Sequence, residues 1–255
     1  MAAVLDTFRL SGRVAIVTGA SRGLGTDMAV ALAEAGADVA LVARGDTSVV
    51  TRAIAHLGRR CCTVKIDVGA AGAAERILAA VTEHLGPADI LVNNAGIIRR
   101  AAFLEFSEAD WDDVMNVNLR AVFRLSQRFA AAVVARQAAG KIINTASLLS
   151  FQGGIRVVSY TAAKSALGGL TRAMANELAP LRINVNAIAP GYMETDNTAQ
   201  LRADPVRQNA ILERIPAGRW GMGADLKGAV VFLASPASDY VHGITLPVDG
   251  GWLAR

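Results

Sequence analysis

The sequence contains few cysteines and histidines, and these shortages exclude two classes of site. Its two cysteines, the adjacent pair Cys61 and Cys62, are too few for a disulfide-stapled scaffold, and neighbouring cysteines rarely bridge each other because the geometry is strained. We therefore expect both to be buried strand residues. The three histidines, His56, His84 and His242, show no metal-ligand spacing, so we expect no metal site.

Long apolar runs and a strong excess of one charge are also absent. No apolar run approaches the ~20 residues that a membrane-spanning helix needs. The first residues lack the basic segment and apolar core of a signal peptide. The net charge is +4, and the arginines are dispersed without the basic and aromatic interleaving that is typical of nucleic-acid binding. We therefore expect a cytoplasmic protein that binds neither membrane nor nucleic acid.

What the chain does contain is an alternation of short β-branched runs with longer alanine-rich helical stretches. The predicted strands are residues 14–17, 38–42, 62–66, 90–92, 141–144, 183–186 and 244–248. Strands that are apolar on both faces and separated by helices indicate a parallel sheet with helices on both sides, which is a Rossmann-like, doubly wound α/β fold. No linker, repeat or shift in composition divides the chain, so residues 1–255 are predicted to form a single domain.

The first predicted strand leads directly into a glycine-rich segment and then into a helix. Glycines in such a turn permit close backbone approach, and the helix N-terminus offers free N–H groups to a pyrophosphate. A purely structural glycine turn is the alternative interpretation. The predicted dinucleotide contacts in this segment are Gly19, Ser21, Arg22, Gly23, Leu24 and Gly25.

The end of the second predicted strand bears on which dinucleotide binds. An acidic side chain there binds the ribose 2′-hydroxyl of NAD, whereas an arginine accommodates the 2′-phosphate of NADP. Here the strand ends in Ala43-Arg44, and Arg22 is a second candidate phosphate partner. NADP(H) is therefore favoured, with NAD(H) and solvated surface arginines as the alternatives. Beyond the third and fourth strands, the predicted cofactor contacts are Asp67, Val68, Asn94, Ala95 and Gly96.

Tyr160 and Lys164 lie four residues apart, hence on one face of a predicted helix. A phenol has a pKa near ~10, and a nearby cation lowers that pKa. Ser147, upstream, can hydrogen-bond a substrate oxygen while charge develops on it. A chance pair on a helix surface would explain Tyr160 and Lys164 alone, but not their occurrence with Ser147 and the glycine-rich turn. Together they predict nicotinamide-dependent interconversion of an alcohol and a ketone.

In these motifs the chain resembles the short-chain dehydrogenase/reductase family over essentially its whole length. The resemblance implies that Tyr160 is the acid/base, that Lys164 orients the ribose and tunes Tyr160, and that Ser147 positions the carbonyl. It also gives a role to Asn118, a polar residue within an apolar helix stripe, as the holder of a water in a proton relay. A further implied property is assembly into a homotetramer. The family's Pro-Gly turn and following threonine, which contact the nicotinamide, fall on Pro190, Gly191 and Thr195.

Several long stretches also resemble the family's sugar-acid dehydrogenases, which act on gluconate and on deoxy or keto-deoxy gluconates. The Ala43-Arg44 ending departs from the NAD preference expected of those enzymes. A carboxylate substrate favours a bidentate arginine clamp, and residues 193–215 are a predicted substrate lid. The candidate substrate contacts are Arg99, Arg100, Gln152, Arg156, Asn197 and Arg202. The alternatives are a 3-oxoacyl-acyl-carrier-protein reductase, which would share every catalytic residue, and a dinucleotide-sensing protein without catalysis.

Overall fold

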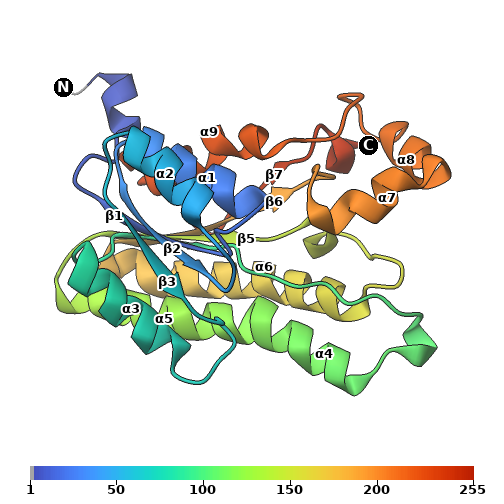
Figure 1. Ribbon diagram of the computed structural model, residues 1–255, viewed down its shortest axis with the longest axis horizontal. Coiled ribbons are helices and arrows are strands. Elements are labelled where there is room, and N and C mark those ends of the chain that lie inside the picture. The colour runs from blue at the N-terminus through green and yellow to red at the C-terminus, as the bar shows by residue number, and fades with distance from the viewer. Residues whose placement is uncertain (1–2) are drawn as a thin grey trace.

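A computed structural model describes residues 3–255, and its centre is one parallel sheet (Figure 1). The strands are β1 (Val14–Thr18), β2 (Asp38–Ala43), β3 (Cys61–Lys65), β4 (Ile90–Asn93), β5 (Gly140–Thr145), β6 (Ile183–Pro190) and β7 (Thr245–Val248). They lie in the order β3-β2-β1-β4-β5-β6-β7, and each neighbouring pair is parallel. The strand order reverses between β1 and β4, which places a ligand crevice at the carboxyl ends of these strands. The predicted doubly wound fold is confirmed.

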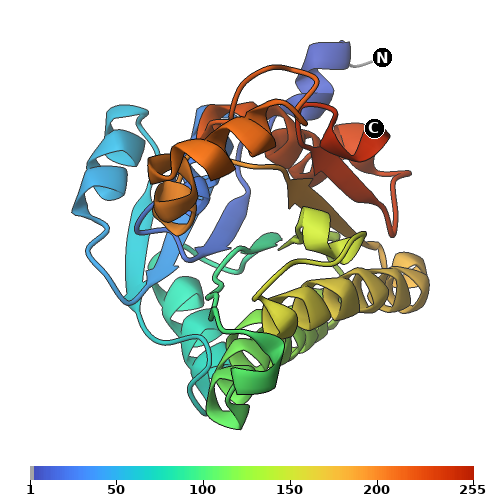
Figure 2. The same cartoon turned by 90° about the vertical axis from the view of Figure 1, so that its right-hand side faces the viewer.

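Helices cover both faces of the sheet (Figure 1). On one face lie α1 (Leu24–Glu34), α2 (Ser48–His56) and α9 (Lys227–Ala234), and on the other α3 (Ala73–His84), α5 (Ala121–Ala135) and α6 (Val158–Leu178). α4 (Glu108–Met115) precedes α5, while α7 (Ala199–Ala203) and α8 (Pro205–Leu212) stand over the end of the sheet seen in Figure 2. Within residues 3–255, no helix has the length and apolar character to cross a bilayer, and no cluster of His, Cys, Asp and Glu could hold a metal ion.

The central strands send alternate side chains into two separate cores. Val17 of β1 packs with Leu32 of α1 on one face, whereas the neighbouring Ile16 packs with Phe129 of α5 on the other. All four side chains are fully buried. Burial of each such side chain contributes ~1.5–3 kcal/mol, so β1 is anchored from both sides. This double anchoring fixes the position of the turn that follows β1.

Two expectations from the sequence need correction. Cys61 and Cys62 are only partly buried, because β3 is an edge strand with one neighbour instead of two. Burial still raises the pKa of each thiol to about 11, so neither is a reactive thiolate at neutral pH. The sixth strand extends four residues beyond the predicted 183–186, to Pro190, because its second half pairs with β7.

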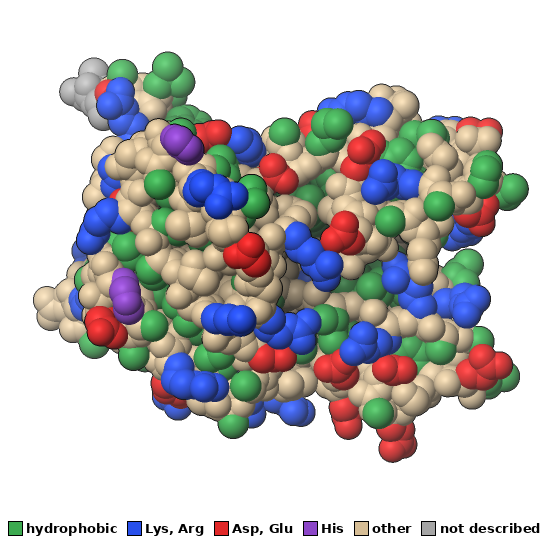
Figure 3. Space-filling view, in the orientation of Figure 1, with side chains coloured by type: hydrophobic (Ala, Val, Ile, Leu, Met, Phe, Trp, Pro, Cys, Tyr) green, Lys and Arg blue, Asp and Glu red, His purple; other side chains and the backbone are tan. Residues whose placement is uncertain are grey.

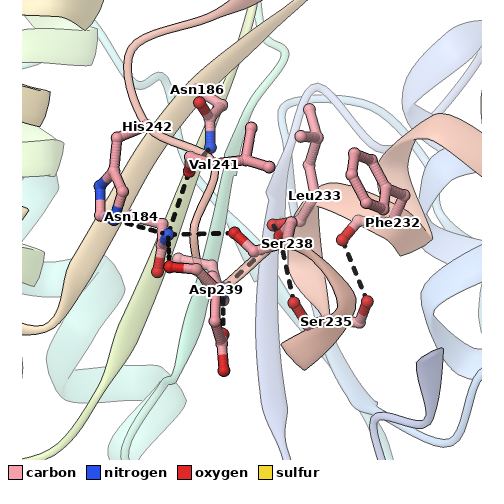
Figure 4. Close-up of polar contacts among 10 residues, drawn as sticks. Asn184, Asn186, Phe232, Leu233, Ser235, Ser238, Asp239, Val241 and His242 are labelled. Carbon is pink, nitrogen blue, oxygen red and sulfur yellow. Dashed lines mark hydrogen bonds and ion pairs between the residues drawn. The ribbon is translucent and has the colours of Figure 1, made fainter. Parts of the chain in front are cut away.

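Polar contacts fasten β6 to the loop before β7 (Figure 4), and an ion pair fastens the amino-terminal end of β5 to the same loop. The side-chain amide of Asn184 lies 3.0–3.2 Å from three main-chain carbonyl oxygens of residues 238–241. On β5, the Lys141 ammonium is almost fully buried and donates to Asp239 at 2.7 Å. Burial lowers the pKa of Lys141, whereas Asp239 opposes this shift. Asp239 is therefore the counter-ion that makes a buried charge tolerable.

Replacing Asp239 with asparagine is expected to lower the free energy of unfolding by about 1–2 kcal/mol, because the Lys141 charge loses its counter-ion. The effect stays below the ~3–5 kcal/mol of a fully buried pair because Asp239 itself is exposed. Urea unfolding monitored by circular dichroism measures the change. Arg9→Gln is the control, since it breaks an exposed ion pair with Asp6 and should change stability by less than ~1 kcal/mol. Equal losses in both variants would contradict the assignment.

Candidate active site

A cleft of about 700 Å³ opens at the carboxyl ends of β1, β2 and β4. Its volume lies within the ~300–1,000 Å³ of typical cofactor and ligand pockets. The lining runs from the end of β2, across the glycine-rich turn, to the first turns of α6. The predicted cofactor contacts that line it are Gly19, Ser21, Arg22, Gly23, Leu24, Arg44, Asp67, Val68, Asn94, Ala95, Gly96, Tyr160, Lys164 and Thr195. The fold thus brings these fourteen scattered positions to one surface.

The glycine-rich turn needs glycine for two different reasons. Gly19 has φ +69°, and a Cβ there would lie 2.9 Å from the Cα of Ala95. A Cβ on Gly25 would lie 2.3 Å from the carbonyl oxygen of Gly19, so Gly25 allows α1 to pack against the turn. Gly25 is therefore structural and does not line the cleft, whereas Gly19 and Gly23 do. The first N–H groups of α1, which begins at Leu24, remain available to a phosphate.

Thr18, which the sequence reasoning did not assign, fastens this turn to the end of β4. Its buried hydroxyl accepts hydrogen bonds from the main-chain N–H groups of Asn94 at 2.9 Å and Ala95 at 3.0 Å. In return, the Asn94 side chain donates to the Thr18 carbonyl at 3.0 Å. The signal available in the sequence was a hydroxyl residue at the last position of β1, directly before the first glycine.

The two arginines assigned to the NADP phosphate both line the cleft, and each faces a carboxylate. Arg44 lies 3.4 Å from Asp67, and Arg22 lies 3.1 Å from Asp196. All four side chains are well exposed, so these ion pairs are weak and a phosphate could replace either carboxylate. Basic and acidic side chains are interspersed over this face of the molecule (Figure 3). The residues present therefore fit a dinucleotide with a 2′-phosphate.

Three of the four predicted catalytic side chains, Ser147, Tyr160 and Lys164, converge beyond the end of β5. The Lys164 ammonium lies 5.5 Å from the centre of the Tyr160 ring and donates to the carbonyl oxygen of Thr145 at 2.5 Å. Ser147, two residues beyond β5, lies close enough to Tyr160 to influence the pKa of its phenol. The Ser147 hydroxyl accepts from the main-chain N–H of Leu149 at 3.2 Å, which orients it. A substrate oxygen can therefore meet the Ser147 and Tyr160 hydroxyls together.

Desolvation dominates the acid–base properties of this group. Burial raises the pKa of Tyr160, and the Ser147 hydroxyl and the positive charge of Arg100 oppose that rise. Burial also lowers the pKa of Lys164 to about 8. In the protein alone, the pKa of Tyr160 is thus raised, and Lys164 does not lower it as expected. Arg100, an unforeseen contributor, acts on the phenol instead.

Asn118 is fully buried within a π-helical segment, Asn116–Arg120, which joins α4 to α5. Its side-chain oxygen accepts from the N–H of Ile97, and its side-chain nitrogen donates to the Ile97 carbonyl, both at 2.9 Å. These two bonds satisfy the polar side chain within the apolar stripe. π-Helical turns inside α-helices often occur at functional sites. Asn118 does not line the cleft, and its role in a water relay stays a prediction.

Of the first two predicted substrate contacts, Arg99 lines the cleft, whereas Arg100 does not. Arg99 is compensated, with Asp110 at 3.2 Å and Asp113 at 2.5 Å. Arg100 instead donates to the main-chain carbonyl of Asn197 at 3.0 Å. This bond connects the loop after β4 with the segment before α7. Of these two arginines, Arg100 therefore keeps its charge available to a ligand.

The other candidates occupy different settings. Arg156 is exposed in a left-handed conformation with φ +64°, and Arg202 donates to the Thr195 carbonyl at 3.4 Å. Gln152 accepts a hydrogen bond from the indole of Trp252 at 3.2 Å. The Pro190–Gly191 turn lies outside the main cleft, and Gly191 lines an adjoining cavity of about 190 Å³.

These features define a dinucleotide-dependent oxidoreductase. They are the parallel sheet, the glycine-rich turn where its strand order reverses, and the Ser147, Tyr160 and Lys164 side chains beside the cleft. Residues 19–253 match the family model described as Enoyl-(Acyl carrier protein) reductase. The chain belongs to the short-chain dehydrogenase/reductase family.

Three similar proteins illustrate its place in the family. The chain is 56% identical to the 2-dehydro-3-deoxy-D-gluconate 5-dehydrogenase of Dickeya dadantii, over 99% of this chain and 100% of the relative. It is 40% identical to the 3-oxoacyl-[acyl-carrier-protein] reductase of Vibrio cholerae, over 95% and 98%. The crystal structure of a gluconate 5-dehydrogenase from Burkholderia cenocepacia in complex with NADP and tartrate superimposes with a TM-score of 0.94, at 40% identity over 99% and 100% of the two chains.

Proposed function

We propose that the chain is an NAD(P)-dependent dehydrogenase that interconverts a secondary alcohol and a ketone on a deoxy or keto-deoxy sugar acid. The observation that carries this proposal is full-length similarity to a sugar-acid dehydrogenase at 56% identity, against 40% for the acyl-carrier-protein reductase. The convergence of Ser147, Tyr160 and Lys164 beside the cleft supports it.

The proposed mechanism assigns one task to each side chain. When bound, NAD(P) supplies the nicotinamide that exchanges a hydride with the substrate carbon. Tyr160 takes the proton of the substrate hydroxyl during oxidation and returns a proton during reduction. Ser147 donates a hydrogen bond that steadies the substrate oxygen as charge develops on it. Lys164 holds the ribose, and Asn118 holds the water that connects Lys164 to solvent.

NADP(H) is the proposed cofactor, with NAD(H) as the alternative. Arg22 and Arg44 provide guanidinium groups on the cleft lining, and no acidic side chain ends β2. The similar Burkholderia enzyme was crystallised with NADP. We therefore propose NADP(H) for this chain, although a sugar-acid dehydrogenase of this family is expected to prefer NAD.

Residues 1–255 are proposed to act as a single domain in which residues 193–215 form the substrate lid. The segment contains α7 and α8, above the carboxyl end of the sheet (Figure 2). Ile211 and Ile215 of the segment are buried against Leu148 and Trp252. Two of its polar contacts with the body of the protein are those of Arg100 with Asn197 and of Arg22 with Asp196. Both involve exposed side chains, so they can break when the segment moves.

Among the predicted clamp residues, Arg100 is proposed to bind the substrate carboxylate. Arg100→Ala should raise KM for the sugar acid about 10- to 100-fold, which corresponds to the ~1.5–3 kcal/mol of a charge-assisted hydrogen bond. Arg99→Ala is the matched control with a smaller expected effect, because Asp110 and Asp113 already neutralise Arg99. Arg156→Ala and Arg202→Ala complete the series. No change of KM in any of the four variants would overturn the clamp.

A substrate panel tests the function itself. Steady-state rates with gluconate, 2-deoxygluconate, 2-dehydro-3-deoxygluconate and a 3-oxoacyl thioester, each with both cofactors, should favour a sugar acid with NADP(H). A clear preference for the thioester would reassign the chain as an acyl-carrier-protein reductase. Tight cofactor binding without turnover of any substrate would instead support a dinucleotide-sensing protein.

We propose a cytoplasmic homotetramer without nucleic-acid or membrane partners, assembled through α5 and α6. The apolar stretch 130–135 of α5 is only partly available for association, because Ala130 and Val133 are buried in the core. Phe123 and Val134 on α5 are exposed and extend the apolar face of this helix. Light scattering at micromolar concentration should give a tetramer, and a monomer would contradict this assembly.

A further inference from the structure

Arg214, two residues beyond α8, is held in place by an aromatic platform. Its guanidinium carbon lies 4.1 Å from the centre of the Trp252 ring, which is the geometry of a cation–π contact. Trp252 is only 4% exposed, and its ring also packs against Tyr192 with centroids 4.6 Å apart. Although Arg214 is an exposed residue, its charged end therefore has a fixed position.

Gln152 connects Arg214 and Trp252 through one oxygen atom. The Gln152 side-chain oxygen accepts from the Trp252 indole at 3.2 Å and from the Arg214 guanidinium at 3.5 Å. Because the oxygen faces both donors, the side-chain nitrogen of Gln152 turns its two hydrogens elsewhere. Within residues 3–255, that nitrogen has no acceptor in hydrogen-bonding distance. A guanidinium and an amide thus present several free donors side by side.

This cluster lies beside the predicted catalytic residues. Gln152 belongs to the loop that runs from Ser147 to Tyr160. Leu148, the residue after Ser147, is buried in the same apolar cluster as Trp252. Tyr192, two residues after Pro190, packs against this cluster as well. The loop after Ser147 and the segment after Pro190, which both carry predicted site residues, therefore meet at the cluster.

Arg214 also differs from Arg99 and Arg219 in its charge balance. Arg99 and Arg219 face carboxylates at 2.5 Å and 2.7 Å, respectively. In the part of the chain that the structure describes, Arg214 has no carboxylate within 4 Å. Its positive charge instead reaches Tyr192, where it opposes the rise in the pKa that burial imposes on the phenol. The available charge and donors require oxygen acceptors from a ligand.

We infer that Arg214 and Gln152 form a second polar subsite, which binds the hydroxyl oxygens of the sugar-acid end remote from the carboxylate. The inference rests on the proposed function, in which Arg100 holds the carboxylate. Guanidinium and amide hydrogens are donors only, so they match a row of hydroxyl oxygens, and the aromatic platform fixes their direction. The subsite would make the enzyme prefer a six-carbon polyhydroxy acid over a short hydroxy acid.

Binding of D-gluconate and of D-glycerate, which lacks the distal hydroxyls, tests the subsite. The protein is a Tyr160→Phe background saturated with NADP⁺, so that no turnover occurs, and calorimetry gives each Kd. The background should bind gluconate at least about 10-fold more tightly than glycerate. Arg214→Gln should reduce this preference to about twofold or less by weakening gluconate binding alone.

Two further variants secure the interpretation. Gln152→Glu places a carboxylate beside Arg214 and consumes its donors without removing the stacked side chain, so it should lower the preference as well. Arg207→Gln is the control, because Arg207 also acts on Tyr192 but has no contact with Trp252 or Gln152. It should leave the preference unchanged.

The outcomes separate the subsite from the proposed function. An unchanged preference in Arg214→Gln, an equal weakening of both acids, or a background without preference would each overturn the subsite. If wild-type enzyme oxidises sugar acids but Arg214→Gln does not change the preference for gluconate over glycerate, the proposed function is supported and the subsite is refuted. If no sugar acid is turned over but gluconate binding depends on Arg214, the proposed function is refuted and the subsite is supported.

Discussion

The Tyr160→Phe enzyme is expected to turn over at about one-thousandth of the wild-type kcat, with Kd for NADP(H) unchanged within about twofold. General acid–base catalysis contributes ~10²–10⁴-fold, and the substitution removes only the proton-carrying hydroxyl. Ser147 remains, but among its contacts with the described residues there is no base that could take its proton. Steady-state rates with the best sugar acid and a fluorescence titration with NADPH provide the two measurements.

Tyr240→Phe is the matched control for this result. Tyr240 is fully exposed, so loss of its hydroxyl should leave both kcat and cofactor affinity at wild-type values. A Tyr160→Phe enzyme within tenfold of wild-type kcat would refute the acid/base role. A large loss of NADPH affinity would show instead that the hydroxyl acts mainly in binding the cofactor.

The fold could be predicted because its determinants are local. The apolar runs that became β1, β2 and β4 are buried on both sides, and the helical stretches between them show a regular apolar spacing. In a parallel sheet with helical crossovers, these features leave few alternative topologies. The strand ends were less predictable. β6 continues through Ala189 to Pro190 because of pairing with β7, a partner about 60 residues away in the sequence.

The positions of the predicted catalytic residues followed from motifs, but their electrostatics did not. Spacing placed Tyr160 and Lys164 on one helix face, and the structure brings Ser147 to them. Spacing could not show that desolvation outweighs the opposing effects of Ser147 and Arg100 on the pKa of the Tyr160 phenol, because desolvation depends on everything packed around the side chain. It also could not show that Arg100 approaches Tyr160.

The substrate arginines were the least predictable part of the candidate site. Whether an arginine is free depends on carboxylates that the fold brings to it, and these can lie far away in the sequence. Arg22 meets Asp196 across 174 residues. Arg214, which no motif singled out, owes its fixed position to Trp252 near the C-terminus and to Gln152 in another loop. Such tertiary pairings are invisible to a single sequence.

Lys164→Met is expected to abolish measurable turnover and to increase stability at neutral pH. Turnover should fall at least about 100-fold, because Tyr160 loses its neighbouring cation and the ribose loses its anchor. Burial lowers the pKa of Lys164 to about 8, so the folded protein holds the ammonium at pH 7 against a desolvation penalty. Methionine has a similar shape without the charge. Each unit by which the pKa is lowered corresponds to ~1.4 kcal/mol. The free energy of unfolding should rise by about 1–2 kcal/mol, which is less than the whole shift would give, because the bond to Thr145 is lost.

The pH dependence of this gain distinguishes desolvation from simple repacking. Lys164 has a pKa of about 8 in the folded chain and near ~10.4 when unfolded, so the unfolded state binds more protons between these values. Wild-type stability should therefore gain from this group as pH rises from about 8 to ~10.4, whereas Lys164→Met lacks that gain. Urea unfolding at pH 7, 8.5 and 10 should show the advantage of the variant shrinking as pH rises. Lys65→Met, at an exposed position on β3, should show no such trend. An advantage that stays constant with pH would mean that better packing stabilises the variant and that the Lys164 ammonium is not strained by burial.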